Sequence, residues 1–134
     1  VGYFLSVHEG PQSINRKNNI PLERGMILSI EPGLYKKNQY GIRIENLYYV
    51  DFANFANNDS SNSYLMFKPL TLVPFDLKLI NFTDLNQDEV RWLNSYHKLV
   101  QESLIESPLL SLTMKEDLKN LTISISLDDY PKTK

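Results

Sequence analysis

The clearest alternation of apolar and polar residues lies in the first third of the chain and predicts two strands joined by a turn. Residues 26–30 form an apolar run that is typical of a buried strand. The dipeptide Pro32-Gly33 and the polar residues 36–39 are typical turn material. Residues 42–45 alternate apolar and polar, which indicates a strand with one face on a core, and the strand is expected to continue through residue 50.

This predicted hairpin brings two carboxylates face to face. If the loop is centred near residue 38, Glu31 lies directly opposite Glu45. Side chains on a strand alternate between its faces, so Arg43 lies on the same face as both glutamates. Like charges opposed across a ladder destabilise it, and burying an unpaired charge is costly. The pattern therefore predicts a cation at this position, which is either Arg43 or metal ions, unless both glutamates are plain surface carboxylates.

Later segments combine a further strand with helices. Residues 65–73 predict a strand that Pro69 restricts to a sheet edge or a bulge. A helix is predicted to begin after Asn86, which forms a capping box with Glu89, and to end before Pro108. Its apolar stripe recurs at spacings of three and four residues and consists of Val90, Leu93, His97, Val100 and Leu104.

The remaining segments carry weaker signals. Thr113 and Glu116 predict the cap of a second short helix that ends near Leu121. Residues 54–63 are rich in Asn and Ser and are expected to form a solvated loop. Residues 128–134 are expected to be a frayed charged tail.

Composition narrows the possible functions. The chain has 134 residues, which suits one domain or a piece of a larger one. A net charge of −2 argues against nucleic-acid binding or a polybasic membrane contact, and no apolar stretch approaches the roughly 18 residues of a spanning helix. Without cysteines, any metal must be held by carboxylates and imidazole. We interpret the protein as cytoplasmic and, because the chain starts at Val1 without a capping signal, as a C-terminal fragment.

Three other polar residues are candidates for chemistry. His8 precedes the rigid turn Glu9-Gly10-Pro11, and turns can hold catalytic groups steadily, although a lone histidine is more often packed or solvent-facing. Arg43 is either a structural ion-pair partner or a group that orients metal ligands. His97, within the predicted helix, is interpreted as a packing or surface residue.

Three motifs stand in one order that resembles a known superfamily. Residues 1–11, 25–35 and 41–45 resemble the C-terminal half of pita-bread metallopeptidases, which include methionine aminopeptidase, prolidase and aminopeptidase P. The downstream segments 69–74 and 92–97 are similar to the C-terminal extension of eukaryotic-type cytosolic Xaa-Pro aminopeptidases. The resemblance covers the chain to about residue 107 and is loose beyond it.

The resemblance implies a fold and a set of site residues. It implies an α+β chain with the C-terminal part of the pita-bread catalytic domain over residues 1–81 and a helical C-terminal extension over residues 82–134. Glu31 and Glu45 match two of five ligands of a dinuclear site, usually of Mn²⁺, that activates a hydroxide. The resemblance makes Glu31 also a general base and His8 a catalytic residue that stabilises the tetrahedral intermediate. The position of Arg43, two residues from Glu45 on the same strand face, favours a group that orients these ligands. The other ligands, two aspartates and a histidine, are expected upstream of this chain.

The resemblance also implies an activity and partners. The expected reaction is hydrolysis of the N-terminal Xaa-Pro bond in peptides with proline in second position, by a protein that forms homodimers through the extension. The isolated chain, lacking three ligands, is expected to be inactive. A prolidase is the alternative within the same class, although it would not be expected to carry the helix around Trp92. A pseudo-peptidase that binds other proteins is the alternative from another class, but such proteins generally lose the metal carboxylates.

Overall fold

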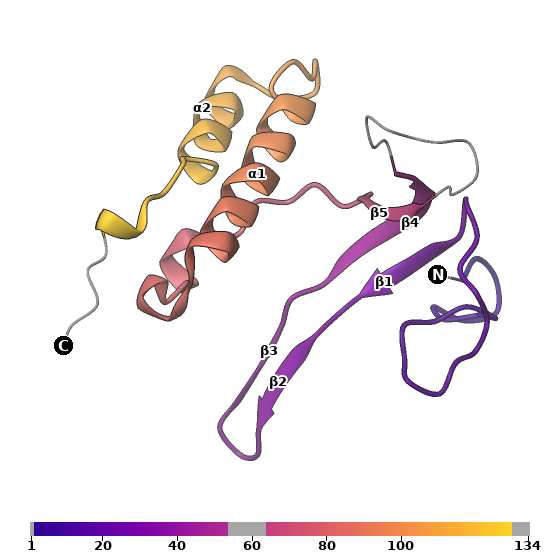
Figure 1. Cartoon of the computed structure of the whole chain (residues 1–134). Helices are drawn as coiled ribbons and strands as arrows, with labels where there is room; N and C mark the ends of the chain where they lie inside the picture. Colours follow the sequence, from indigo (N-terminus) through magenta and orange to yellow (C-terminus); the bar gives the residue numbers. More distant parts are fainter. Residues whose placement is uncertain (1, 54–63, 130–134) are drawn as a thin grey trace. The chain divides into compact units, whose positions relative to one another are not determined.

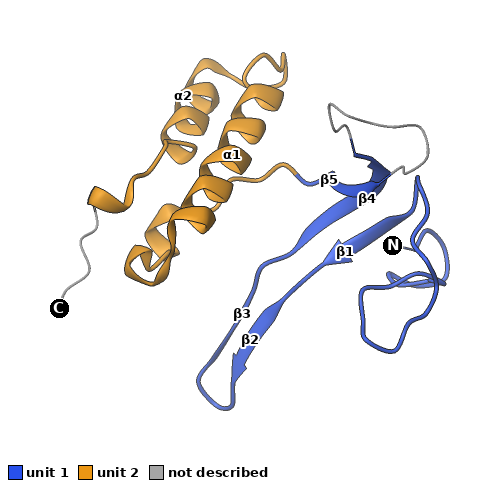
Figure 2. Ribbon diagram, in the orientation of Figure 1, with its two compact units in different colours: residues 1–71 blue, residues 72–134 orange. Residues whose placement is uncertain are grey.

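The computed structural model describes residues 2–53 and 64–129, and it divides the chain into two compact units (Figure 2). The first unit is Val1–Thr71 and the second is Leu72–Lys134. The loop expected at residues 54–63 and the last residues of the expected tail lie outside the described part. The boundary predicted between residues 81 and 82 falls within the second compact unit and stays a prediction about domains.

The described residues of the first unit form five strands in two antiparallel sheets (Figure 1). A three-stranded sheet has the order β1-β4-β5 and consists of β1 (Ile27–Ile30), β4 (Asn46–Phe52) and β5 (Leu65–Pro69). A separate hairpin pairs β2 (Gly33–Lys36) with β3 (Tyr40–Arg43). Strand β5 lies at the sheet edge and ends at Pro69, which confirms the edge position predicted from that proline.

One register runs through both sheets and confirms the predicted centre of the hairpin. Ile30 pairs with Asn46, and Gly33 pairs with Arg43, so Glu31 faces Glu45 between the two ladders. The backbone at Asn38 has φ 59°, in the left-handed region that Asn tolerates in turns.

The prediction of one continuous strand from residue 42 to 50 is wrong. The ladder is interrupted between Arg43 and Asn46, where Ile44 donates a hydrogen bond of 3.0 Å to the carbonyl of Pro32. Pro32 has no N–H group and cannot return a bond to Ile44. This break leaves Glu45 between two strands.

Burial in the first unit is more limited than the apolar run 26–30 predicted. Leu28, Val50 and Ala53 are buried, whereas Ile27 in the same run is exposed. Among the described residues β1 pairs with β4 alone, and only Leu28 of its four residues is buried, so it is not a fully buried strand within this chain.

The second unit is a pair of helices with short 3₁₀ turns. Helix α1 (Gln87–Leu104) begins at the predicted capping box, in which Asn86 accepts hydrogen bonds from the N–H groups of Asp88 and Glu89, and the Glu89 carboxylate accepts the N–H of Asn86. The remaining elements are η1 (Leu77–Leu79), η2 (Phe82–Asp84), α2 (Leu112–Leu121) and η3 (Leu127–Asp129). None of the helices in the described ranges has the length and hydropathy needed to cross a bilayer.

The predicted stripe of α1 forms the core of the second unit. Val90, Leu93, His97 and Val100 are buried. Leu104 packs half-buried against a cluster that contains Val100. Tyr96, which the spacing argument left out, is also buried and packs with Val100 and with Leu118 of α2.

The predicted cap of α2 is two residues too late. The helix begins at Leu112, and the side chain of Ser111 accepts a hydrogen bond of 3.2 Å from the N–H of Met114. Serine caps helices at least as well as threonine, so the earlier hydroxyl takes the position and Thr113 lies inside the first turn. The helix ends at Leu121, as predicted.

Candidate active site

Glu31 follows β1 directly and makes more polar contacts than Glu45, the carboxylate that it faces. The hydroxyl of Ser29 donates a hydrogen bond of 2.7 Å to Oε1 of Glu31, whose side chain is 29 % exposed. This bond lowers the pKa of Glu31 most, burial opposes the shift, and the charges of Arg43 and His8 lower the pKa further. The Glu31 carboxylate is therefore ionised at neutral pH.

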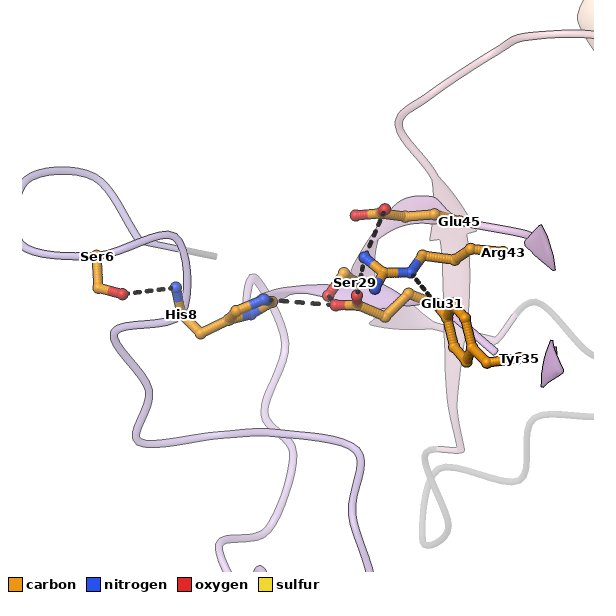
Figure 3. A network of polar contacts seen from close by, with 7 residues as sticks. All are labelled: Ser6, His8, Ser29, Glu31, Tyr35, Arg43 and Glu45. Carbon is orange, nitrogen blue, oxygen red and sulfur yellow. Dashed lines mark hydrogen bonds and ion pairs between the residues drawn. The ribbon is translucent and has the colours of Figure 1, made fainter. Parts of the chain in front are cut away.

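Arg43, the last residue of β3, connects the two glutamates (Figure 3). Its Nη1 lies 3.2 Å from Oε2 of Glu31 and 3.9 Å from Oε2 of Glu45. Its Nε donates a hydrogen bond of 2.9 Å to the hydroxyl of Tyr35, which is the largest cause of the raised pKa of Arg43. The structure thus places the guanidinium of Arg43 between the facing carboxylates. Arg43 was one of the two kinds of cation that the sequence pattern allowed at this position.

His8 reaches the same place from the irregular segment at the start of the chain (Figure 3). Its Nε2 lies 3.4 Å from Oε1 of Glu31, and its side chain is 62 % exposed. The structure therefore brings together all four residues that the sequence pointed to: His8, Glu31, Arg43 and Glu45.

A pocket of about 410 Å³ lies beside Glu31. Its polar wall consists of His8, Ser13, Ser29 and Glu31, and its apolar wall consists of Ile14, Leu28, Ile30 and Pro32. A site with a few convergent polar groups against an apolar wall is typical of small-ligand pockets.

Sequence reasoning missed Ser29 and Tyr35. Ser29 precedes Glu31 by two residues and therefore shares its strand face, a signal that could have been used. Tyr35 lies diagonal to Arg43 across the β2–β3 ladder, within reach of a long side chain. His97, in contrast, is a packing residue as interpreted, because it is buried in the second unit and its Nε2 accepts the N–H of Phe75 at 3.0 Å.

The donor set suits a hard divalent cation but is small. Carboxylate oxygens are preferred by ions such as Mg²⁺, Ca²⁺ and Mn²⁺. Among the residues that the structure describes, no three His, Asp or Glu side chains gather as a complete metal site. Glu31 and Glu45 lie 3.2 Å and 3.9 Å from the same nitrogen of Arg43, so the two carboxylates share one cationic side chain.

The chain is similar to proteins of a known metallopeptidase family. The model of metallopeptidase family M24 matches residues 1–51, and the model of the C-terminal region of peptidase M24 matches residues 63–122. Aminopeptidase P2 of Arabidopsis thaliana is 48 % identical over 112 residues, which are 82 % of this chain and 16 % of that protein. A probable Xaa-Pro aminopeptidase P of Coprinopsis cinerea is 45 % identical over 113 residues, 82 % of this chain and 18 % of that protein.

A solved structure gives the same result at the level of the fold. The X-prolyl aminopeptidase of Caenorhabditis elegans, described as a cytosolic enzyme with a di-nuclear active site, is 36 % identical to this chain. It matches with a TM-score of 0.75 over 93 % of this chain and 20 % of its own length.

The chain belongs to the M24 metallopeptidases and has the α+β pita-bread fold of that family. Within the family it is similar to the C-terminal part of aminopeptidase P, and it spans about a fifth of the length of the relatives that it matches. The match to the C-terminal region continues to residue 122, further than the motifs alone indicated.

Proposed function

We propose that this chain is the part of a longer Xaa-Pro aminopeptidase, here called the parent protein, that supplies two carboxylate ligands to a site for two divalent metal ions. The observation that carries the proposal is the position of Glu31 opposite Glu45, with Arg43 and His8 in contact with Glu31. The description of the Caenorhabditis elegans relative as di-nuclear supports two ions rather than one.

The residues present fit such ions in part. Glu31 and Glu45 offer hard oxygen donors on one strand face, which suits Mn²⁺. The resemblance to the family assigns the other three ligands, two aspartates and a histidine, to the rest of the parent protein. When bound, two divalent ions would activate a water and polarise the scissile carbonyl.

Each side chain has a proposed role that its contacts support. Glu45 would help to hold both ions. Glu31, kept ionised by Ser29 and Arg43, would hold one ion and accept a proton from the attacking water. His8, exposed beside Glu31, contacts the substrate and stabilises the tetrahedral intermediate. Arg43 orients both carboxylates.

The proposed substrates are peptides with proline in second position. The apolar wall of the pocket beside Glu31, formed by Ile14, Leu28 and Ile30, suits an apolar side chain or a proline ring. We propose a cytoplasmic location because the similar nematode enzyme is described as cytosolic. We also propose a homodimer through the helical extension, where the large apolar surface of Trp92 is exposed.

Replacement of Glu45 by Gln in the parent protein tests the metal assignment. The change removes one negative charge from between the ions, so we expect loss of bound metal and at least about a 100-fold fall in the cleavage of an Xaa-Pro peptide. Elemental analysis and peptide turnover measure the two effects. Glu23→Gln is the matched control, because the Glu23 side chain is exposed and makes no hydrogen bond or ion pair within the described residues. An active and fully metallated Glu45→Gln protein would contradict the assignment.

Two rival functions make different predictions for the same preparation. A prolidase would cleave Xaa-Pro dipeptides and leave longer peptides intact. A pseudo-peptidase that only binds proteins would show no turnover with either substrate, whatever metal is added. The retention of His8 in contact with Glu31, and of Glu31 and Glu45 both beside Arg43, favours an enzyme.

A further inference from the structure

The segment in front of His8 is held by one carboxylate rather than by a helix or a strand. The side chain of Glu9 accepts hydrogen bonds from four successive backbone N–H groups. The donors and distances are Tyr3 at 2.9 Å, Phe4 at 3.0 Å, Ser6 at 3.3 Å, and Leu5. A further bond of 2.6 Å from the N–H of Gly2 to the carbonyl of Val7 closes the same loop.

Glu9 is well suited to this structural task. The backbone N–H groups, that of Tyr3 first, lower the pKa of Glu9 to about 2, so the side chain is an anion at any physiological pH. Hydrogen bonds to an ionised acceptor are stronger than neutral ones. An amide in place of the carboxylate would turn an NH₂ donor toward N–H donors and would leave some of them without an acceptor.

His8, in turn, depends on this loop for its position. Its side chain is largely exposed, and its single charged contact within residues 2–53 and 64–129 is Glu31 at 3.4 Å. Its backbone N–H makes one long bond of 3.4 Å to the hydroxyl of Ser6 (Figure 3). The backbone N–H of Ser6 is itself bound to Glu9. The placement of the imidazole beside Glu31 therefore follows from the folding of residues 2–7.

We propose that Glu9 is a positioning residue: by gathering the N–H groups of residues 3–6, its carboxylate holds His8 at Glu31. The proposal rests on the proposed function, in which His8 acts on the substrate. A displacement of a reacting group by about 1 Å can cost about 100-fold in rate, so a loosened loop is expected to lower turnover rather than metal binding.

The first test compares Glu9→Gln with the wild-type parent protein loaded with Mn²⁺. We expect kcat on an Xaa-Pro peptide to fall about 10- to 100-fold, with metal content unchanged, and hydrogen exchange at the amides of residues 3–6 to become faster. Glu9→Asp retains the charge and is expected to recover part of kcat. Glu23→Gln, which changes an exposed carboxylate in the same unit, is expected to match the wild type.

A double-mutant cycle separates positioning from general stability. If Glu9 acts through His8, Glu9→Gln should reduce kcat less than about 3-fold in a His8→Ala background, because coupled residues are not additive. Equal losses in both backgrounds would overturn the proposal, as would unchanged exchange at residues 3–6, or faster exchange with full turnover. If the wild type does not cleave Xaa-Pro peptides, the proposed function is wrong, and so is the proposed effect of Glu9 on turnover. The hydrogen exchange of residues 3–6 separately tests whether Glu9 holds the loop.

Discussion

Arg43 lies between two carboxylates and makes its shortest bond to a third group, the hydroxyl of Tyr35. A single guanidinium offsets only one of the two negative charges of Glu31 and Glu45. Its side chain is half exposed, so water and salt weaken these contacts. In the proposed site, the remaining negative charge would attract a divalent ion.

Asp51 is the other carboxylate in the first unit with several charged partners. Lys68 donates to it at 2.7 Å and Arg24 at 2.8 Å, and these bonds, that of Lys68 first, hold the pKa of Asp51 well below its ordinary value of 3.8. A lowered pKa in the folded state stabilises the fold above the unfolded pKa, and this stabilisation is lost as the pH falls below about 3.8.

We expect Asp51→Asn to lower the urea midpoint of the parent protein at pH 7 and to flatten the decline of stability between pH 4 and pH 2. The variant cannot lose a charge on acidification, so its midpoint should approach that of the wild type at low pH. Asp117→Asn, an exposed aspartate of α2, is the matched control. Parallel pH profiles for the wild type and Asp51→Asn would show that the Lys68 and Arg24 bonds do not stabilise the fold.

Single residues of the site were predictable where one strand pairing determined them. Glu31, Glu45 and Arg43 follow from the hairpin centre at residue 38, which a turn signal in the sequence reveals. The role of Glu9 was not predictable, because its carboxylate binds backbone N–H groups of residues 3–6, and any sequence provides such groups. The contact between His8 and Glu31 also depends on the path of that irregular loop.

At the scale of elements, the start of α1 depends on the capping box of Asn86 and Glu89. We expect Asn86→Ala to destabilise the helix by about 1 kcal/mol, because the N–H groups of Asp88 and Glu89 lose their acceptor. Hydrogen exchange of the amides in the first turn measures the effect locally. Asn86→Ser retains a cap and should behave nearly as the wild type; if both variants exchange like the wild type, the cap does not contribute.

The buried stripe of α1 makes a stronger prediction. Leu93 is 5 % exposed, so Leu93→Ala should destabilise the parent protein by about 2–5 kcal/mol through lost burial and the cavity left behind. Leu99, on the same helix but 41 % exposed, supplies the control Leu99→Ala, for which a much smaller loss is expected. Denaturant midpoints compare the two, and equal losses would mean that the Leu93 side is not the core-facing side of the helix.

Helices and strands were predictable where residues close in sequence determine them. They were less predictable where pairing with another strand determines their bounds. The capping box and the spacing of Val90, Leu93 and Val100 indicated α1 correctly from sequence alone. The interruption at Ile44 was missed because its cause, Pro32, lies on the opposite strand. Likewise, the burial of residues 26–30 depends on which residues cover the sheet, and the apolar run itself does not determine those residues.

At the scale of the whole molecule, the β2–β3 hairpin has an unusual surface for a self-contained domain. All residues of both strands are exposed, including Leu34 at 57 % and Ile42 at 56 %. Contiguous exposed apolar side chains indicate contact with other protein surface or a liability to aggregate. Since the chain spans about a fifth of its relatives, we expect the remainder of the parent protein to cover this hairpin.

The 134-residue chain on its own, supplied with Mn²⁺, should therefore release no first residue from an Xaa-Pro peptide above a metal-only control. Glu31 and Glu45 offer two carboxylates, and without further ligands they cannot hold two ions against the repulsion between the ions. Without metal the same two carboxylates repel each other across the ladder, and the uncovered Leu34 and Ile42 favour self-association. Peptide turnover and analytical ultracentrifugation of the isolated chain measure both effects, with the parent protein as the positive control. Turnover by the isolated chain, or a monomer with one sharp thermal transition, would show that these residues form a self-sufficient unit, and the assignment of the missing ligands to the rest of the parent protein would then be wrong.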